Sequence, residues 1–125
     1  MKFLTILFCL TFSNSLFLDQ PSKKLIVFTG SDWCPNCKQF DQSVLKDSLF
    51  LRFIQQNKIQ LEIVDFPQRS FQSDSVKQEN IKKADYFDFE GEFPSIYLFN
   101  LNDSSVRQID YNRENPEMFC KSLLN

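Results

Sequence analysis

Hydrophobic residues recur along the chain with two different spacings, which together predict a protein that alternates strands with helices. The apolar run 25–29 is unbroken and rich in β-branched residues, and it ends at Gly30 and Ser31. Such a run is typical of a strand that is covered on both faces of a sheet. The segment 59–66 mostly alternates apolar with polar residues and stops at Pro67, which predicts a second strand.

Helical spacing fills the interval between these strands. Apolar residues recur at helical spacing over 34–54, with a polar interruption at 46–48. The pattern predicts either one helix with a break or a short second helix capped by Asp47. A polar loop at 68–75 precedes a further predicted helix over 75–86.

The last third of the chain predicts two strands and a helix. The runs 95–99 and 106–111 flank a turn rich in asparagine and aspartate, a pattern typical of a β-hairpin. Asn115 and Pro116 predict the start of a last helix, because asparagine caps helices and proline suits their first position. The predicted order, β-α-β-α-β-β-α, indicates a single α/β domain.

Residues 1–15 have the pattern of a secretory signal peptide. Lys2 precedes an apolar run of about ten residues, and Ser13 and Ser15 form a small-x-small cleavage site. We expect cleavage after Ser15, which leaves one domain, residues 16–125, in the periplasm or another secreted location. The alternative is an uncleaved membrane anchor, although a bilayer span needs ~20 apolar residues.

Composition narrows the chemistry of this domain. The chain has no histidine, which excludes Ser-His-Asp and Cys-His nucleophiles and removes the commonest metal ligand. Its formal net charge of −2 and its lack of a basic stripe argue against nucleic-acid binding. Fifteen phenylalanines predict a densely aromatic core, and a chain of this length can bury one without disulfide bonds.

Cys34 and Cys37 stand where the first predicted strand gives way to the first helix. A Cys-x-x-Cys pair at this point puts one sulfur at the start of the helix and the other one turn later, close enough to displace the first from a mixed disulfide. The positive end of the helix dipole and the cation of Lys38 favour the thiolate of Cys34, whereas the negative charge of Asp32 opposes it.

Two segments of the chain resemble the signatures of one protein family. Residues 28–38 read Phe-Thr-Gly-Ser-Asp-Trp-Cys-Pro-Asn-Cys-Lys, and residues 92–97 read Glu-Phe-Pro-Ser-Ile-Tyr. The first segment resembles the active-site stretch of the thioredoxin-like superfamily, and the second resembles its other signature. The resemblance covers about residues 23–124 and implies the thioredoxin-like fold, a three-layer α/β/α arrangement with a mixed central sheet.

The resemblance also implies roles for individual residues. Cys34 is expected to be the attacking thiol and Cys37 the resolving one. Pro94 is expected to follow a cis peptide bond and to face the cysteines, with the neighbouring backbone pairing with an extended substrate, whereas a trans proline on an edge strand is the alternative. Trp33, Phe93 and Pro94 are therefore the expected substrate-binding residues, with ordinary core packing as the alternative for Trp33.

The sequence departs from thioredoxin proper in two ways. Phe28 stands where that subfamily carries a buried aspartate, so water, Lys38 or Asp65 would have to take the proton of the resolving cysteine. The dipeptide between the cysteines also lacks the histidine found in strongly oxidising relatives, which favours reduction or isomerisation over oxidation.

The sequence thus predicts a thiol-disulfide oxidoreductase, a protein-disulfide reductase or isomerase that needs no cofactor and no metal. Its expected substrates are cysteine-containing exported proteins, its electron donor is a membrane-bound thiol-disulfide protein, and it is expected to act as a monomer.

Several alternatives stay open beside this prediction. The domain could be a binding module whose cysteines do not turn over, or a metallochaperone. A zinc site would need four ligands, and Cys120 is the only further cysteine of the domain. A structural disulfide would constrain little of the unfolded chain across so short a loop. Cys120 itself is predicted to be a small buried hydrophobic residue rather than a reactive thiol.

Overall fold

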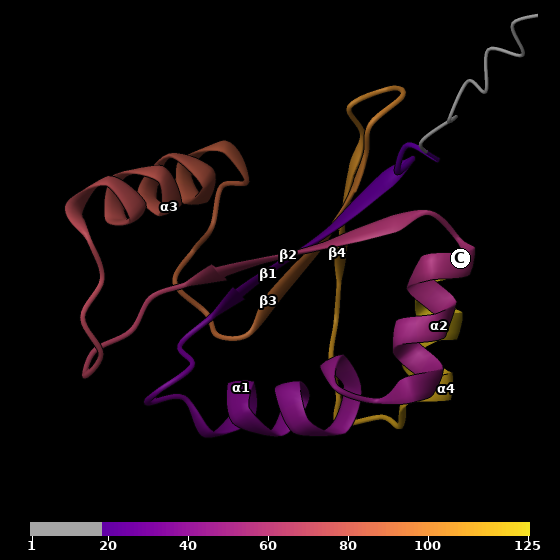
Figure 1. Ribbon diagram of the computed structural model, residues 1–125, viewed down its shortest axis with the longest axis horizontal. Helices are drawn as coiled ribbons and strands as arrows, with labels where there is room; N and C mark the ends of the chain where they lie inside the picture. Colours follow the sequence, from indigo (N-terminus) through magenta and orange to yellow (C-terminus); the bar gives the residue numbers. More distant parts are fainter. Residues whose placement is uncertain (1–18) are drawn as a thin grey trace, which may run out of the picture.

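A mixed four-stranded sheet forms the centre of the computed structural model, which describes residues 19–125 (Figure 1). Neighbouring strands in the sheet follow the order β2-β1-β3-β4. β1 pairs with β2 in parallel and with β3 in antiparallel orientation, and β3 pairs antiparallel with β4. The strands are β1 (Lys23–Thr29), β2 (Ile59–Asp65), β3 (Ser95–Asn100) and β4 (Val106–Ile109). The expected signal peptide and its cleavage site lie outside the described residues.

The helices follow the predicted order, with the first one interrupted. Asp47 ends the interruption, because its carboxylate accepts hydrogen bonds from the backbone N–H groups of Leu49 (2.8 Å) and Phe50 (3.3 Å) and so caps α2. The break that the sequence predicts is therefore confirmed. The segments are α1 (Pro35–Phe40), the π-helical η1 (Asp41–Leu45), α2 (Ser48–Gln56), α3 (Asp74–Tyr86) and α4 (Pro116–Leu124).

Helices cover both faces of the sheet, which confirms the three-layer α/β/α arrangement (Figure 1). Successive side chains of a strand point to opposite faces. Leu25 and Val27 of β1 belong to the core that α1, η1, α2 and α4 close, whereas Ile26 and Phe28 belong to the core under α3. The central strand is thus buried on both sides, as its continuous apolar sequence predicts.

Aromatic rings fill much of both cores. Phe28 stacks on Phe89 with ring centroids 4.6 Å apart and meets Tyr97 edge-on at 5.6 Å. On the other face, Phe40 and Phe119 pack edge to face at 5.1 Å. Full burial of one such ring contributes ~1.5–3 kcal/mol, so the expected aromatic core is confirmed.

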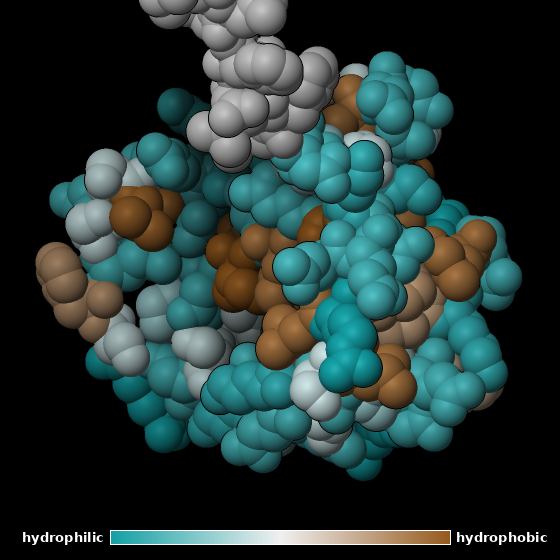
Figure 2. All heavy atoms as spheres, turned by 45° about the vertical axis from the view of Figure 1, so that its right-hand side comes forward, coloured by the Kyte–Doolittle hydropathy of each residue, from teal (hydrophilic) through white to brown (hydrophobic). Residues whose placement is uncertain are grey.

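Apolar side chains also reach the surface on the side of α2 and α4. Figure 2 turns this side forward and shows brown side chains near the centre of the face, bordered by teal ones. Helices α2 and α4 expose Leu49, Leu51, Met118 and Leu124. Within residues 19–125, no helix combines the length and the hydrophobicity that a membrane span requires.

The sheet brings together, at one end of its strands, three segments that are distant in sequence. Because β1 and β2 are parallel, the loops after Thr29 and Asp65 leave the sheet at the same end. β3 runs the opposite way and begins at this end, where Ser95 pairs with Phe28, so the chain before it arrives at the same edge. The Cys-x-x-Cys pair, the loop after β2 and Pro94 therefore lie together.

Candidate active site

Cys34 and Cys37 form a disulfide at the start of α1, with their Cα atoms 5.2 Å apart. Cys34 is the N-cap residue, and its Sγ accepts a hydrogen bond from the Cys37 N–H at 3.2 Å. The N–H of Gly30 donates to the Sγ of Cys37 at 3.4 Å. Both sulfur atoms therefore lie among backbone donors, as expected at the amino end of a helix.

Both cysteines of the disulfide are buried. Cys34 is 5% exposed and Cys37 is 2% exposed, whereas Pro35 and Asn36 between them are exposed. Cys37 is thus the more buried of the two. In this oxidised state the chain around Phe93 lies against the sulfur of Cys34 and contributes to its burial.

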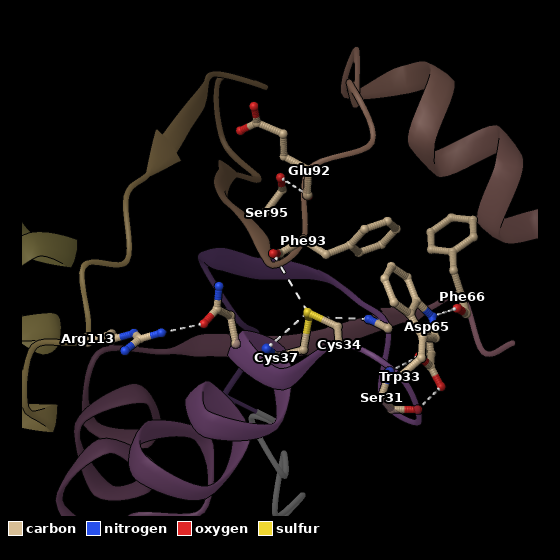
Figure 3. Close-up of a disulfide and its surroundings, with 12 residues drawn as sticks. Ser31, Trp33, Cys34, Cys37, Asp65, Phe66, Glu92, Phe93, Ser95 and Arg113 are labelled. Carbon is tan, nitrogen blue, oxygen red and sulfur yellow. Dashed lines mark hydrogen bonds between the residues drawn. A yellow bond between two sulfur atoms is a disulfide. The ribbon is translucent and has the colours of Figure 1, made fainter. Parts of the chain in front are cut away.

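The peptide bond between Phe93 and Pro94 is cis, as the family resemblance implies. This loop faces the disulfide, and the carbonyl oxygen of Phe93 lies 3.8 Å from the Sγ of Cys34 (Figure 3). The Ser95 hydroxyl donates to the carbonyl of Glu92 at 2.6 Å and so links the two ends of the turn 92–95 that contains Pro94. In the reduced protein, the Phe93 carbonyl could accept a hydrogen bond from the Cys34 thiol.

Trp33 is fixed beside the disulfide rather than free at the surface. Its indole Nε1–H donates to the carbonyl of Phe66 at 2.8 Å, and its ring meets Phe93 edge-on at 5.1 Å. Gly30 leaves the space for the indole, since a Cβ atom there would lie 2.6 Å from Trp33 Nε1. Figure 3 shows Trp33 and Phe66 together on one side of the cysteines. Contact with a substrate stays a prediction for Trp33, Phe93 and Pro94.

Asp32 points its carboxylate at the loop after β2. The backbone N–H of Gln68 donates to Oδ1 at 3.0 Å, and those of Arg69 and Ser70 donate to Oδ2 at 2.8 and 2.7 Å. These hydrogen bonds, that of Gln68 first, hold the pKa of Asp32 well below its ordinary value, although desolvation, the second-largest contribution, opposes them. The three N–H donors thus offset the negative charge of Asp32, which would otherwise disfavour the thiolate of Cys34.

A second carboxylate ties the same two loops together. Asp65, the last residue of β2, accepts the N–H of Ser31 at 2.9 Å and the hydroxyl of Ser31 at 2.5 Å. The sequence predicts only a polar loop after β2, and it misses that this loop belongs to the site. No local pattern marks the connection, because the Asp32 contacts span 36 to 38 residues of sequence.

Arg113 approaches from the opposite side and is a further residue that the sequence reasoning missed. Its Nη2 donates to the Oδ1 of Asn36 at 2.9 Å, across a sequence separation of 77 residues (Figure 3). Arg113 has a left-handed backbone conformation with φ of 61°. Together with Pro94 and Tyr111 it lines a groove of about 380 Å³ beside the cysteines.

Comparison with known proteins agrees with this arrangement. The family model described as Thioredoxin-like matches residues 17–100. The chain belongs to the thioredoxin-like family. It is 28% identical over 86 residues to the Disulfide bond reductase DsbH of Chlamydia pneumoniae, a match that covers 69% of this chain and 51% of that protein. The chain thus spans about half the length of this curated relative.

Solved structures share the fold of this thioredoxin-like chain. The structure titled DsbH Oxidoreductase aligns with a TM-score of 0.73 at 22% identity, covering 83% of this chain and 74% of the other. A thioredoxin from Thermus thermophilus aligns with a TM-score of 0.52 at 15% identity, covering 82% of this chain and 71% of the other.

One departure from thioredoxin proper changes the surroundings of Cys37. Phe28 is fully buried and contributes an aromatic ring to the core where that subfamily has a carboxylate. A cavity of about 320 Å³ lies next to Cys37 and is lined also by Lys38 and Asp41, so water and an amine can reach this side of the disulfide. Asp65 is engaged by Ser31 instead. That water or Lys38 takes the Cys37 proton stays a prediction.

Cys120 is on α4 and belongs to the core that α1, η1, α2 and α4 close. It is 4% exposed and carries a free thiol. Desolvation, helped by the negative charge of Asp47, raises the pKa of this thiol above its ordinary value. The prediction of a small buried hydrophobic residue is confirmed. Among residues 19–125, no three metal-ligating side chains converge on a common point.

Proposed function

We propose that this thioredoxin-like protein is a thiol-disulfide oxidoreductase that reduces or isomerises disulfides in exported proteins. One observation carries the proposal: the Cys34–Cys37 disulfide caps α1 directly against the cis-proline loop, with the Phe93 carbonyl 3.8 Å from the Sγ of Cys34. This juxtaposition gives a reactive sulfur and a strand-like backbone edge at the same place, which is what attack on a peptide-borne disulfide requires.

The reaction begins from the reduced dithiol. The Cys34 thiolate attacks one sulfur of the substrate disulfide, a bond forms between Cys34 and the substrate, and the other substrate sulfur leaves as a thiolate that takes up a proton. The Cys37 thiolate then attacks the Cys34 sulfur and releases the second substrate thiol. Two electrons pass from the dithiol to the substrate, and the Cys34–Cys37 disulfide remains. If the substrate's own thiol resolves the intermediate, the net reaction is isomerisation.

The assignment of Cys34 as the nucleophile has two supports. Its Sγ accepts the Cys37 N–H, which stabilises negative charge on that sulfur. It is also the more exposed of the two cysteines and the one that faces the Phe93 carbonyl. An extended substrate segment beside Pro94 would present its disulfide to this sulfur, with Trp33 and Phe93 as flanking contacts.

The sequence and one relative support the proposed direction and location of the reaction. The dipeptide Pro35-Asn36 supplies no histidine to stabilise a thiolate, which favours reduction or isomerisation. The similar chlamydial protein is named a disulfide bond reductase. Export through residues 1–15 would bring the domain to a compartment where disulfides persist. A membrane-bound thiol-disulfide protein would then restore the dithiol of this monomeric enzyme.

Reduction of insulin by dithiothreitol tests the proposal. The wild-type protein is expected to accelerate the precipitation of the insulin B chain, Cys34→Ser to abolish the acceleration, and Cys120→Ser to retain it. Refolding of scrambled ribonuclease in a glutathione buffer separates isomerase from reductase. A wild-type protein that leaves the insulin reaction at its uncatalysed rate would overturn the proposal.

A binding module with an idle disulfide is the second candidate. It is favoured by one observation, the burial of Cys34 and Cys37, which are 5% and 2% exposed. The two candidates differ in the same insulin assay, because an idle disulfide gives no turnover even though dithiothreitol is present. Capture of a partner that is equally strong with wild type and Cys34→Ser would support the module.

A further inference from the structure

The loop after β2 is held against the active-site loop by several hydrogen bonds. Asp32 binds the backbone of residues 68–70, Asp65 binds Ser31, and the Trp33 indole binds the Phe66 carbonyl. Hydrogen bonds to a carboxylate are the stronger kind in proteins. This surface loop is therefore fixed relative to Cys34, although loops of such polar sequence are ordinarily among the more mobile parts of a fold.

Phe71 stands at the exposed end of this fixed loop. Its side chain is 93% exposed, and it follows Ser70, the last residue whose N–H the Asp32 carboxylate accepts. A single exposed apolar residue needs no explanation in general. Phe71 differs because its backbone is anchored one residue away to Asp32, which itself lies two positions before Cys34.

Aromatic rings connect the disulfide with the base of this loop. Trp33 meets Phe93 at 5.1 Å, and Phe66 meets Phe93 at 5.9 Å. Phe71 lies five residues beyond Phe66 on the same loop. Phe71 is thus no farther from Phe66 than five extended residues reach, at ~3.3 Å per residue, and a substrate chain several residues long covers the same span.

We infer that the segment 66–71 is a second wall of the substrate site, with Phe71 as a contact for the substrate and Asp32 as the residue that positions the wall. The inference rests on the proposed oxidoreductase function and narrows its substrate class to polypeptide disulfides flanked by apolar residues. A polypeptide is the occupant because only a chain that extends beyond its own disulfide reaches from Cys34 to Phe71. A small disulfide reaches the sulfur alone.

The test compares two substrates, insulin and hydroxyethyl disulfide, and measures kcat/KM for each with dithiothreitol as reductant. For Phe71→Ala, the ratio of the insulin value to the small-disulfide value is expected to fall about fivefold to tenfold, since a phenyl ring partly buried by the substrate is lost. The fall should come from a higher KM for insulin with kcat unchanged, because Phe71 would contact the substrate equally in the bound ground state and in the transition state. Leu124→Ala is the matched control, as Leu124 is 64% exposed on α4.

Asp32→Asn tests the positioning role. An amide has one accepting oxygen, whereas the carboxylate uses both of its oxygens for three donors, so the substitution releases part of the loop. The ratio is expected to fall in the same direction as for Phe71→Ala. The double variant should lose no more than the larger single loss, because Asp32 acts through the loop that carries Phe71. Asp103→Asn is the control, since Asp103 accepts only within the β3–β4 turn.

The outcomes separate the inference from the function on which it rests. If the wild type reduces neither substrate, the oxidoreductase function itself is overturned and the inference with it. If the wild type reduces both and Phe71→Ala keeps the wild-type ratio, the inference is wrong and the function stands. If the losses of Asp32→Asn and Phe71→Ala add in the double variant, Asp32 does not act through the loop.

Discussion

Substitution of Gly30 by alanine is expected to displace Trp33. A Cβ atom at this position would lie 2.6 Å from the Nε1 and the Cζ2 of the indole, a separation that real Cβ atoms essentially never show. The indole cannot move cheaply, because it donates to the Phe66 carbonyl at 2.8 Å and packs against Phe93. Relief of the overlap therefore breaks that hydrogen bond and opens the wall of the site.

The magnitude follows from three contributions. Overpacking of this kind costs ~1–3 kcal/mol, and the lost hydrogen bond costs ~0.5–1.5 kcal/mol. Alanine offsets part of this by restricting the unfolded chain, which contributes ~0.4–1 kcal/mol. Gly30→Ala should thus lower the free energy of unfolding by roughly 0.5–4 kcal/mol.

Urea denaturation followed by tryptophan fluorescence measures both effects. Trp33 is the single tryptophan of the chain, so its emission reports on this position alone. We expect a lower unfolding midpoint and a red-shifted emission in the folded Gly30→Ala protein. An unchanged midpoint together with wild-type emission would refute the reasoning.

Gly91→Ala is the matched control for this prediction. Gly91 has φ of +87°, and a Cβ atom there would meet no atom within 4 Å. The substitution costs ~1–2 kcal/mol through its left-handed backbone, without contact with Trp33. Its emission should stay that of the wild type, so a red shift in both variants would show that the spectrum reports general loosening instead.

Three further predictions address the core, an ion pair and the third thiol. Phe119→Ala should lower the unfolding free energy by ~3–5 kcal/mol in urea titrations, because the fully buried ring packs on Phe40; a loss below 1 kcal/mol would contradict the packing. Burial raises the pKa of Glu62, but Lys83 and Lys24 outweigh it and hold the pKa below its ordinary value of 4.5. The ion pairs of Glu62 with these lysines therefore stabilise the fold fully above pH 4.5. This stabilisation is lost as the pH falls through the lower pKa that Glu62 has in the folded state. Lys83→Met should accordingly cost ~0.5–1 kcal/mol at neutral pH and almost nothing in acid, and a pH-independent difference between the unfolding curves would exclude this linkage. Iodoacetamide should label Cys120 of the reduced native protein only after urea is added, since burial shields the thiol and raises its pKa; mass spectrometry that finds Cys120 labelled before urea is added would contradict this.

The sequence predicts the fold through patterns that are local. Three such patterns agree with the folded structure: the unbroken apolar run of β1, the Asp47 cap of α2 and the Asn115-Pro116 start of α4. The expected strand at 106–111 is wrong at its end, because pairing with β3 stops at Ile109 and Tyr111 packs on Phe40 instead. The π-helical turn of η1, in which the Lys46 N–H donates to the Asp41 carbonyl, leaves no signal in hydrophobic spacing.

In the candidate site, too, the residues in local motifs are predicted and the long-range contacts are not. Cys34, Cys37 and Pro94 lie in short motifs, and the geometry that the family resemblance implies for them is observed. The contacts of Asp32 with residues 68–70 and of Arg113 with Asn36 are long-range pairings between a side chain and a distant segment. Neither partner has a distinctive sequence, so only the folded sheet, which brings the loops together, reveals them.

The convergence of three loops at one sheet edge has a consequence for how such a protein can diversify. The hydrophobic layers that supply most of its stability lie behind that edge, and Phe66 and Phe93 of the loops also pack against one of them. Residues such as Phe71 and Arg113 can be exchanged at little energetic expense, whereas the strands beneath them cannot. Related proteins can therefore differ in the partners that their loops bind while they keep the same sheet and the same pair of cysteines.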